Sequence, residues 1–341
     1  MKSYNILLTG ASGTVGREVL KQISNHPSYN VTVFDVKTKQ SELLLKKYSD
    51  TIKIVYGDIR NPNDIEKATK EIDVVLHLAA IIPPLADENT KLAREVNVEG
   101  THKLLQSVQK NSPKAFFLYG SSISVYGDRI LNPMIQCNDP IHPSENDYYA
   151  KTKIEAEELV KNSGLSWSIF RIAAVMGYGN HKLDGIMFEM PLNTSLEIIT
   201  PADTARAFVH AIEHQELLKN NIYNLGGGEK CRTSYREFLG NAFRIYGLGK
   251  LDFPDHAFAE RNYHCGYYAD GNKLNDILHF QKDTLDLYFQ KLKAFIAPVQ
   301  HAVTFLFKRP IKYFLQKKSL PYKAYKHHDK KLLLRFFPAY E

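Results

Sequence analysis

Two side chains with complementary chemistry lie one helical turn apart near the middle of the chain. Within residues 148–153 only Tyr149 is followed by a lysine four positions later, Lys153. On a helix this spacing places both side chains on one face. A nearby ammonium group stabilises phenolate and lowers the pKa of the tyrosine from its usual value of ~10. The pair therefore predicts a tyrosine that exchanges a proton with a substrate hydroxyl group.

Hydroxyl side chains precede this pair by about twenty-five residues. The apolar run 115–119 predicts a buried strand, and the serines Ser121, Ser122 and Ser124 follow at its carboxyl end. A tyrosine and a lysine at this spacing occur often by chance and then have only a structural role. Their significance depends on the rest of the chain.

A glycine-rich turn near the start has the pattern of a dinucleotide site. The apolar run 6–8 precedes the segment 9–16, which reads TGASGTVG, and apolar residues at helical spacing follow. The pattern predicts a strand, a tight turn and a helix. Glycines spaced three apart let a pyrophosphate approach the N–H groups at the helix N-terminus, where the helix dipole favours negative charge. We expect the dinucleotide to contact Gly10, Ser12, Gly13, Thr14, Val15 and Gly16.

Two acidic residues extend this candidate site. Asp35 ends the next apolar run, nineteen residues after Gly16. A carboxylate there accepts hydrogen bonds from the ribose hydroxyls and repels a 2′-phosphate, so NAD is favoured over NADP. Asp58, with its neighbour Ile59, lies where a side chain meets the adenine amino group. The alternative for Asp58 is a carboxylate that caps the helix beginning near Asn63.

Small side chains end the buried strand predicted over residues 74–80. Ala79 and Ala80 would let the cofactor lie against the carboxyl end of this strand, where ligands bind in open α/β sheets. Asn97 has two interpretations that the sequence does not separate. It is either a residue at the entry of the helix that follows or a support of the active site.

Taken in order, the residues resemble those of an extended short-chain dehydrogenase/reductase, the NAD-dependent epimerase/dehydratase group. The resemblance covers roughly residues 5 to 290 and is most specific in the first half. It implies that Tyr149 is the catalytic acid/base, that Lys153 binds the nicotinamide ribose and tunes Tyr149, and that Ser122 hydrogen-bonds the reacting oxygen. It also implies that Ala173 lies beside the nicotinamide and that the following segment opens the substrate pocket.

The substrate side departs from the family pattern. Ala174 stands where nucleotide-sugar enzymes commonly use asparagine, and the segment before Asp203 holds no arginine for a diphosphate. Arg232 and Arg261 remain candidate phosphate ligands, with Arg261 the better one, and each is equally readable as a surface arginine. Ser124 occupies a position expected to face the substrate.

Three functions stay open. The first is an NAD-dependent dehydrogenase or reductase of a secondary alcohol or ketone with a lipid-like substrate, similar to the 3β-hydroxysteroid dehydrogenases. An apolar pocket formed by residues 81–85 and 187–191 favours it, although these residues also suit an ordinary core. The second is a nucleotide-sugar 4-epimerase, and the third is a non-catalytic NAD-binding scaffold. Dehydration is disfavoured because Ile123-Ser124 supplies no acid pair.

Composition sets further bounds on the chain. At 341 residues it is long enough for a large core, and its three cysteines have no metal-ligand spacing, which predicts a reducing compartment and no bound metal. Neither a signal peptide nor an apolar run of the ~18 residues that span a bilayer is apparent. We expect a cytoplasmic protein, and a homodimer because the resemblance implies pairing through the helix that bears Tyr149.

The last fifty residues differ from the rest. Residues 291–341 carry twelve lysines and arginines and two acidic residues, a net charge of +10. The net charge of the whole chain is +7, so the remainder of the chain is net negative. Nucleic acid is therefore not expected to bind the main domain. Apolar residues at helical spacing from Leu285 are interrupted by Pro298, and basic residues then alternate with aromatic ones. Such a segment suits either the inner surface of an anionic membrane or an arm that packs on its own domain or a partner subunit.

The expected fold class is therefore α/β, a Rossmann-type doubly wound parallel sheet with a small C-terminal substrate-binding region and an amphipathic basic tail. We assign residues 1–175 to the dinucleotide-binding core, 176–290 to a substrate-binding region interleaved with the last core elements, and 291–341 to the tail.

Overall fold

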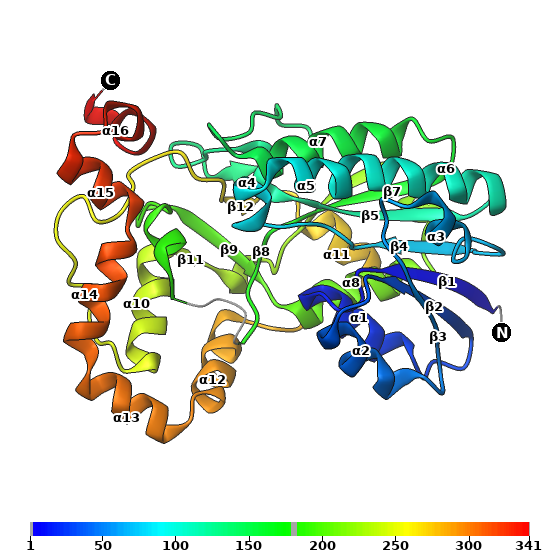
Figure 1. Ribbon diagram of the computed structural model, residues 1–341, viewed down its shortest axis with the longest axis horizontal. Helices are drawn as coiled ribbons and strands as arrows, with labels where there is room; N and C mark the ends of the chain where they lie inside the picture. The colour runs from blue at the N-terminus through cyan, green and yellow to red at the C-terminus, as the bar shows by residue number, and fades with distance from the viewer. Residues whose placement is uncertain (1–2, 179–182, 341) are drawn as a thin grey trace.

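The computed structural model describes residues 3–178 and 183–340, and in this part of the chain a seven-stranded parallel sheet forms the centre (Figure 1). The strand order is β10-β7-β5-β4-β1-β2-β3. The strands are β1 (Tyr4–Thr9), β2 (Tyr29–Asp35), β3 (Lys53–Tyr56), β4 (Val74–His77), β5 (Phe116–Ser122), β7 (Ser166–Ile172) and β10 (Asn221–Leu225). This topology confirms the doubly wound parallel sheet, and the order reverses between β1 and β4, where such sheets bind ligands.

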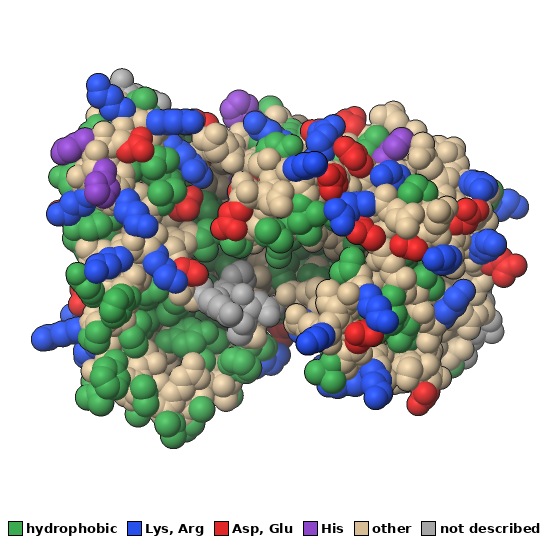
Figure 2. Space-filling view, in the orientation of Figure 1, with side chains coloured by type: hydrophobic (Ala, Val, Ile, Leu, Met, Phe, Trp, Pro, Cys, Tyr) green, Lys and Arg blue, Asp and Glu red, His purple; other side chains and the backbone are tan. Residues whose placement is uncertain are grey.

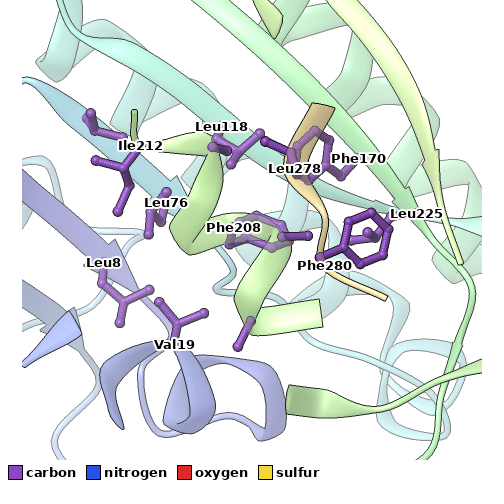
Figure 3. Close-up of a cluster of buried hydrophobic side chains, with 14 of the residues drawn as sticks. Leu8, Val19, Leu76, Leu118, Phe170, Phe208, Ile212, Leu225, Leu278 and Phe280 are labelled. Atoms are coloured by element: carbon purple, nitrogen blue, oxygen red, sulfur yellow. The ribbon is translucent and has the colours of Figure 1, made fainter. Parts of the chain in front are cut away.

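Helices cover both faces of the sheet because its strands are apolar on both sides. On one face, α1 (Thr14–Ile23), α8 (Pro201–Ala211) and α11 (Asn272–Leu278) pack against the strands. Figure 3 shows this core, in which Leu8, Leu76 and Leu118 of three adjacent strands meet side chains of these helices. The labelled helical side chains include Val19, Phe208, Ile212 and Leu278.

The opposite face is covered by α3 (Pro62–Glu66), α6 (Thr101–Asn111) and α7 (Tyr148–Lys161). A π-helical turn, Glu95–Gly100, leads directly into α6. The remaining helices of this half are α2 (Lys39–Leu45), α4 (Leu85–Glu88), α5 (Thr90–Arg94) and α9 (Gln215–Leu218).

A second lobe forms where the chain leaves the sheet after β7. It holds the short sheet β11-β9-β8, made of β8 (Ala174–Val175), β9 (Ser195–Ile199) and β11 (Arg232–Ser234), and the helix α10 (Tyr235–Tyr246). A parallel pair of β6 (Met134–Ile135) and β12 (Tyr267–Tyr268) joins distant segments beside it. Strand β10 returns to the main sheet between these elements, so the two lobes are interleaved in sequence.

In the part of the chain that the structure describes, five α-helices follow residue 284. They are α12 (Leu285–Phe295), α13 (Pro298–Leu306), α14 (Lys308–Lys318), α15 (Leu320–His327) and α16 (Lys330–Phe336). The expected interruption at Pro298 is present, because this proline is the first residue of α13. Helices α14 to α16, which the sequence analysis did not predict, run along the outside of the second lobe (Figure 1).

Part of this tail packs on its own chain. Leu333, Phe336 and Phe337 are buried with Ala259, and the Ser319 hydroxyl donates to the Ala257 carbonyl oxygen at 2.7 Å. Helices α15 and α16 therefore pack on their own domain. The apolar side chains of α13 and of the outer face of α14 remain exposed on this chain.

Candidate active site

The glycine-rich turn lies against the end of β4. Gly10 has a φ of +73°, and a Cβ atom there would lie 2.7 Å from the Cα and N atoms of Ala79. A Cβ atom at Gly16 would overlap the Gly10 carbonyl oxygen. Only glycine fits these positions, so the turn after β1 can pass close to the backbone of Leu78 and Ala79 and fold tightly on itself.

The N-terminus of the next helix faces this turn. Gly13 is the N-cap of α1 and has no side chain with which to cap it. Thr14, Val15 and Gly16 form the first turn, and N–H groups in the first turn of an α-helix have no acceptor within the helix. A pyrophosphate suits this arrangement because the helix dipole and the backbone N–H groups both favour it.

Asp35 braces the same turn. Its carboxylate accepts hydrogen bonds from Ser12 N at 2.6 Å and from Val36 N at 2.8 Å, and only 6% of the residue is exposed. Asp35 thus fixes the turn from the end of β2, where the sequence predicts a ribose ligand.

Asp58 does not cap a helix. Its carboxylate forms an ion pair with Arg60 at 2.6 Å, and Arg60 also contacts Glu95 at 3.0 Å. The cap of α3 is Asn61, which accepts from Asn63 N, so the capping alternative for Asp58 is wrong. The Arg60 hydrogen bonds hold the pKa of Asp58 below its usual range.

The neighbouring Ile59 is 4% exposed, and a Cβ atom at Gly100 would lie 2.7 Å from its side chain. The Ile59 side chain is therefore core, which leaves only its backbone to meet a cofactor.

Asn97 ties two parts of the site together. Its side-chain amide accepts from Ile81 N at 2.8 Å and donates to Ile81 O at 2.9 Å and to the Thr152 hydroxyl at 3.0 Å. The Thr152 hydroxyl in turn donates to Tyr149 O at 2.7 Å. Asn97 lies in the π-helical turn, and its contacts favour a supporting role over a simple entry residue.

The three candidate catalytic side chains come from two elements. Ser122 ends β5, and its hydroxyl lies within hydrogen-bonding reach of the Tyr149 phenol at the start of α7. Lys153, one turn further along α7, donates from Nζ to the Gly120 carbonyl oxygen at 2.7 Å. Its Nζ lies 5.7 Å from the centre of the Tyr149 ring. This arrangement allows proton exchange at one substrate oxygen, held between Ser122 and Tyr149.

The expected lowering of the Tyr149 pKa is wrong for the protein without ligand. Burial, and the nearby Asp147 carboxylate, raise this pKa above its usual value. Burial also lowers the pKa of Lys153 to about 7, because the low-dielectric surroundings disfavour the ammonium form. NAD fits the neighbouring turn and, in its oxidised form, would bring a hydride acceptor and a positive charge to this side of the site.

Sequence reasoning missed the groups that hold the start of α7. Asp87 accepts hydrogen bonds from Tyr148 N at 3.1 Å and Tyr149 N at 3.2 Å, across about sixty residues of sequence. Asp147 caps the helix through Ala150 N and pairs with His264 at 2.7 Å. The cap was visible in the sequence as an aspartate before a helix, whereas the partner Asp87 had no local signal.

A buried ion pair lies behind Lys153. Glu157 and Arg171 contact each other at 2.7 Å with side chains that are 1% and 3% exposed. The Ser121 hydroxyl donates to Glu157 at 2.5 Å. Ser121 therefore serves this network, and Glu157 supports the charged form of Lys153.

The predicted substrate residues Ser124 and Ala174, and the predicted nicotinamide neighbour Ala173, differ in how deeply they are buried. Ser124 is fully buried, and its hydroxyl has no hydrogen-bond partner in the described residues, so it contacts a ligand only if its surroundings rearrange. Ala173 is 4% exposed and donates its N–H to Leu225 O. Ala174 is half-buried in β8 beside Ile198.

Both candidate phosphate arginines are bound to their own chain. The Arg261 guanidinium donates to the Leu334 carbonyl oxygen in α16. Arg232 contacts the buried Glu197 at 2.9 Å and donates to Tyr268 O at 2.7 Å. Neither contact is expected of an arginine that is free to bind a diphosphate.

The two segments predicted to form an apolar pocket lie in different surroundings. Met187, Phe188 and Met190 belong to the core of the second lobe, together with Phe243. The other segment is exposed, because Ile82, before α4, is 59% exposed and Leu85, the first residue of α4, is 44% exposed. Helix α4 also holds Asp87, which bonds to the start of α7. Figure 2 shows the surface hollowed between the two lobes.

The chain is similar in sequence to several known proteins. A model described as the NAD dependent epimerase/dehydratase family matches residues 6–226. An uncharacterized membrane protein of Methanocaldococcus jannaschii is 25% identical over 342 residues, which cover 88% of this chain and 97% of the relative. Sterol-4-alpha-carboxylate 3-dehydrogenase, decarboxylating, of Candida albicans is 32% identical over 190 residues, covering 52% of this chain and 53% of that enzyme.

Among solved structures, UDP-glucuronic acid 4-epimerase from Bacillus cereus, in complex with UDP-glucuronic acid and NAD, superposes with a TM-score of 0.70. It is 21% identical, and the alignment covers 85% of this chain and 98% of that chain. At this identity the likeness concerns the fold. Across the described residues, the helices are too short or too polar to cross a membrane.

Proposed function

This chain belongs to the NAD dependent epimerase/dehydratase family and is an NAD-dependent enzyme, and we propose that it oxidises a secondary alcohol or reduces a ketone on a lipid-like substrate. In the oxidative direction, the Tyr149 phenolate takes the proton of the substrate hydroxyl, and NAD, when bound, would supply the acceptor for the hydride that leaves the carbon. Ser122 holds the reacting oxygen, and Lys153 in its charged form stabilises the phenolate. Gly10, Gly13 and Asp35 belong to the cofactor side of the proposed site.

The apolar segment beside the catalytic helix carries this proposal. Ile82 and Leu85 expose large hydrophobic side chains, and α4, which begins at Leu85, is joined to the backbone of Tyr149 through Asp87. Exposed apolar side chains on a segment bonded to the start of the catalytic helix suit a hydrophobic substrate better than a sugar diphosphate. The similar sterol dehydrogenase of Candida albicans, by its name, acts on a substrate of this class.

A nucleotide-sugar 4-epimerase is the alternative. The Bacillus cereus epimerase, which binds UDP-glucuronic acid and NAD, has the same fold. The engagement of Arg232 by Glu197 and of Arg261 by Leu334 argues against it, because a diphosphate needs cationic ligands. A non-catalytic NAD-binding scaffold is disfavoured by the presence of Ser122, Tyr149 and Lys153 together.

The Tyr149→Phe variant tests the catalytic assignment. We expect turnover to fall by at least ~10²-fold, because the acid/base group is lost, while NAD affinity stays unchanged. The matched control is Tyr148→Phe, which removes the hydroxyl of the adjacent tyrosine. Rates are measured from NADH absorbance, and NAD affinity by calorimetry. Retained activity in Tyr149→Phe would remove this residue from the mechanism.

Cofactor exchange separates the two reaction classes. A dehydrogenase releases its cofactor in each turnover, so bound NAD should exchange rapidly with added labelled NAD, and a hydrophobic secondary alcohol such as a 3β-hydroxysterol should produce NADH. An epimerase retains its cofactor and returns the hydride. Slow exchange together with interconversion of UDP-sugars would favour the alternative.

We also propose a homodimer that pairs through α6 and α7. These helices lie side by side and border a groove of about 690 Å³ whose lining includes Leu105, Gln109 and Leu159. A Leu159→Arg substitution should convert the dimer to a monomer in light scattering. A variant that remains dimeric would contradict pairing at this surface.

We further propose that the protein is cytoplasmic and makes peripheral contact with the inner face of a membrane through the 291–341 tail. The exposed apolar and basic side chains of this segment support the contact. Delivery from a membrane suits a lipid-like substrate.

A further inference from the structure

Helix α13 presents an apolar face that its own chain does not cover. Val299 is 74% exposed, Val303 is 51% exposed and Leu306 is 75% exposed, and their spacing of four and three residues places them on one side. Every residue of α13 is exposed except the half-buried Thr304. The opposite side contacts the end of α10, where His301 bonds to Ile245 O at 3.2 Å.

Aromatic side chains extend this face on both sides. Phe295 at the end of α12, Phe307 before α14 and Phe314 within α14 are each at least half exposed. Figure 2 shows hydrophobic side chains gathered at the lower left, where Figure 1 places α12, α13 and α14. A single exposed leucine is ordinary, whereas a continuous patch of this kind marks an interaction surface.

The positive charge around this patch indicates which kind of partner it binds. Residues 287–328 contain nine lysines and arginines and no aspartate or glutamate, and of the nine, Lys291, Lys312 and Lys318 pair with aspartates from outside this range. A second copy of the same surface would bring these positive charges together, which disfavours self-association. A nucleic acid would satisfy the charge but would leave the valine and leucine side chains of α13 uncovered. An anionic lipid surface accommodates both features.

A basic groove between α14 and α15 adjoins the patch. Its volume is about 490 Å³, and it is lined by Tyr313, Gln316, Lys317, Tyr322, Lys323, Lys326 and His327. Lys317 Nζ lies 4.5 Å from the Tyr313 ring centre, and Lys326 Nζ lies 5.6 Å from that of Tyr322. The tyrosine faces hold the lysine side chains, so a phosphate group would meet ammonium groups that are already oriented.

The surface is held in place by the second lobe. Lys312 Nζ donates to Lys250 O at 2.7 Å, and Leu315 on the inner side of α14 is 7% exposed. In α15, Ala324 is 1% exposed. Docking would therefore require little ordering of the chain, because the helices are already packed.

We propose that α13 and the α14–α15 groove form one docking surface for an anionic bilayer. The apolar face of α13 enters the boundary between headgroups and acyl chains, and the groove receives a lipid headgroup phosphate. This inference rests on the proposed peripheral contact of the tail, but it does not depend on the hydride-transfer chemistry.

The test is cosedimentation of the full chain with vesicles. One set is phosphatidylcholine alone, and the other mixes phosphatidylcholine with the anionic lipid phosphatidylglycerol. Each lysine near an anionic surface is expected to strengthen binding roughly fivefold. We expect binding to the anionic vesicles that weakens with salt. Leu306→Ser should reduce it by about tenfold or more. The triple variant Lys317→Gln, Lys323→Gln, Lys326→Gln should reduce it about a hundredfold.

Matched controls change similar residues elsewhere. Leu217→Ser alters a leucine that is 62% exposed on α9, and Lys46→Gln, Lys47→Gln, Lys70→Gln removes three exposed lysines from the nucleotide-binding half. Both controls should bind vesicles like the unmodified chain. NAD affinity, measured on every variant, reports folding and separates a failure of the docking surface from a failure of the proposed enzyme.

Several outcomes would overturn the docking surface. These are no binding to the anionic vesicles, equal loss in the control variants, or binding that ignores Leu306→Ser. Self-association that Leu306→Ser abolishes would assign the patch to a second copy. Binding to a DNA duplex that the triple lysine variant abolishes, without vesicle binding, would assign it to nucleic acid.

Discussion

At Lys153, burial opposes the charge that proton exchange requires. The residue is 4% exposed, and its ammonium group has Gly120 O as an acceptor and Glu157 as a nearby anion. These contacts do not fully offset desolvation, so its pKa falls from 10.5 to about 7. The native protein releases this proton near pH 7, whereas the unfolded chain keeps it until pH 10.5. Stability therefore rises with pH between these two values.

Replacing Lys153 should show how much its burial lowers the stability of the folded protein. Lys153→Met is expected to be more stable than the unmodified chain at pH 7, by on the order of a few kcal/mol, because it removes a buried charge. The difference in stability between Lys153→Met and the unmodified chain should narrow as the pH rises to 10. Thermal unfolding at both pH values measures it, with the exposed neighbour Lys151→Met as control. A difference that is independent of pH would contradict the shifted pKa.

At the scale of elements, the site depends on one helix held from several sides. The start of α7 receives Asp87 from α4 and Asp147 from the preceding loop, and Asn97 reaches it through Thr152. On the cofactor side, the turn after β1 is fixed by its contact with Ala79. Small displacements of either element would separate the proton-exchanging group from the cofactor turn.

Asn97→Ala should destabilise the protein by about 2–4 kcal/mol, because it leaves the N–H and carbonyl groups of Ile81 without their partner. Chemical denaturation measures the loss. Asn111→Ala removes an amide that bonds only to the Thr69 and Ser107 side chains, and it should cost less. Equal losses in the two variants would contradict the role given to Asn97.

Gly10→Ala should abolish NAD binding at concentrations that saturate the unmodified chain, because a Cβ atom collides with Ala79 and the φ of +73° is unfavourable. Gly249→Ala is the control that separates the collision with Ala79 from the unfavourable φ. The φ of Gly249 is +76°, but an added Cβ atom there has open space within 4 Å. Calorimetric titration should show normal NAD affinity in Gly249→Ala. Normal affinity in Gly10→Ala would contradict the assignment of the turn.

The sequence predicted the elements whose patterns are local. The glycine turn, the apolar strands and the spacing of Tyr149 and Lys153 all depend on residues close together, and the sheet topology confirms the architecture that they indicate. Contacts between distant segments were not predictable, such as Asp87 with Tyr149 or Arg261 with Leu334. The Tyr149 pKa was misjudged because burial, which the sequence does not reveal, outweighs the lysine.

At the scale of the whole molecule, the second lobe is closed by residues far along the chain. Phe336 and Phe337 are each 1% exposed, and Arg335 contacts Glu189 at 3.2 Å. The tail is thus part of the core of this lobe, although α13 projects an uncovered face. Packing and surface binding belong to different helices of the same segment.

Phe336→Ala should destabilise the protein by about 3–5 kcal/mol, because it leaves a cavity among Ala259, Ala324 and Leu333. NAD affinity should stay unchanged, since the nucleotide turn lies in the other lobe. Tyr340→Ala, at a residue that is 42% exposed, is the control and should have little effect. Thermal unfolding with and without NAD measures both expectations. A loss of NAD affinity in Phe336→Ala would show that the lobes are coupled.

The interleaving of the two lobes has a consequence for how such a protein can change. The glycine turn, Ser122, Tyr149 and Lys153 all precede β7, whereas β8, β9, β11 and α10 follow it and build the second lobe. Mutations or recombination downstream of β7 can therefore alter the second lobe without disturbing the inherited chemistry. A chimaera joined at Ile172, the last residue of β7, would preserve that chemistry while exchanging the rest, provided the donor also supplies replacements for β10 at the sheet edge and for α8 and α11 on one face of the sheet.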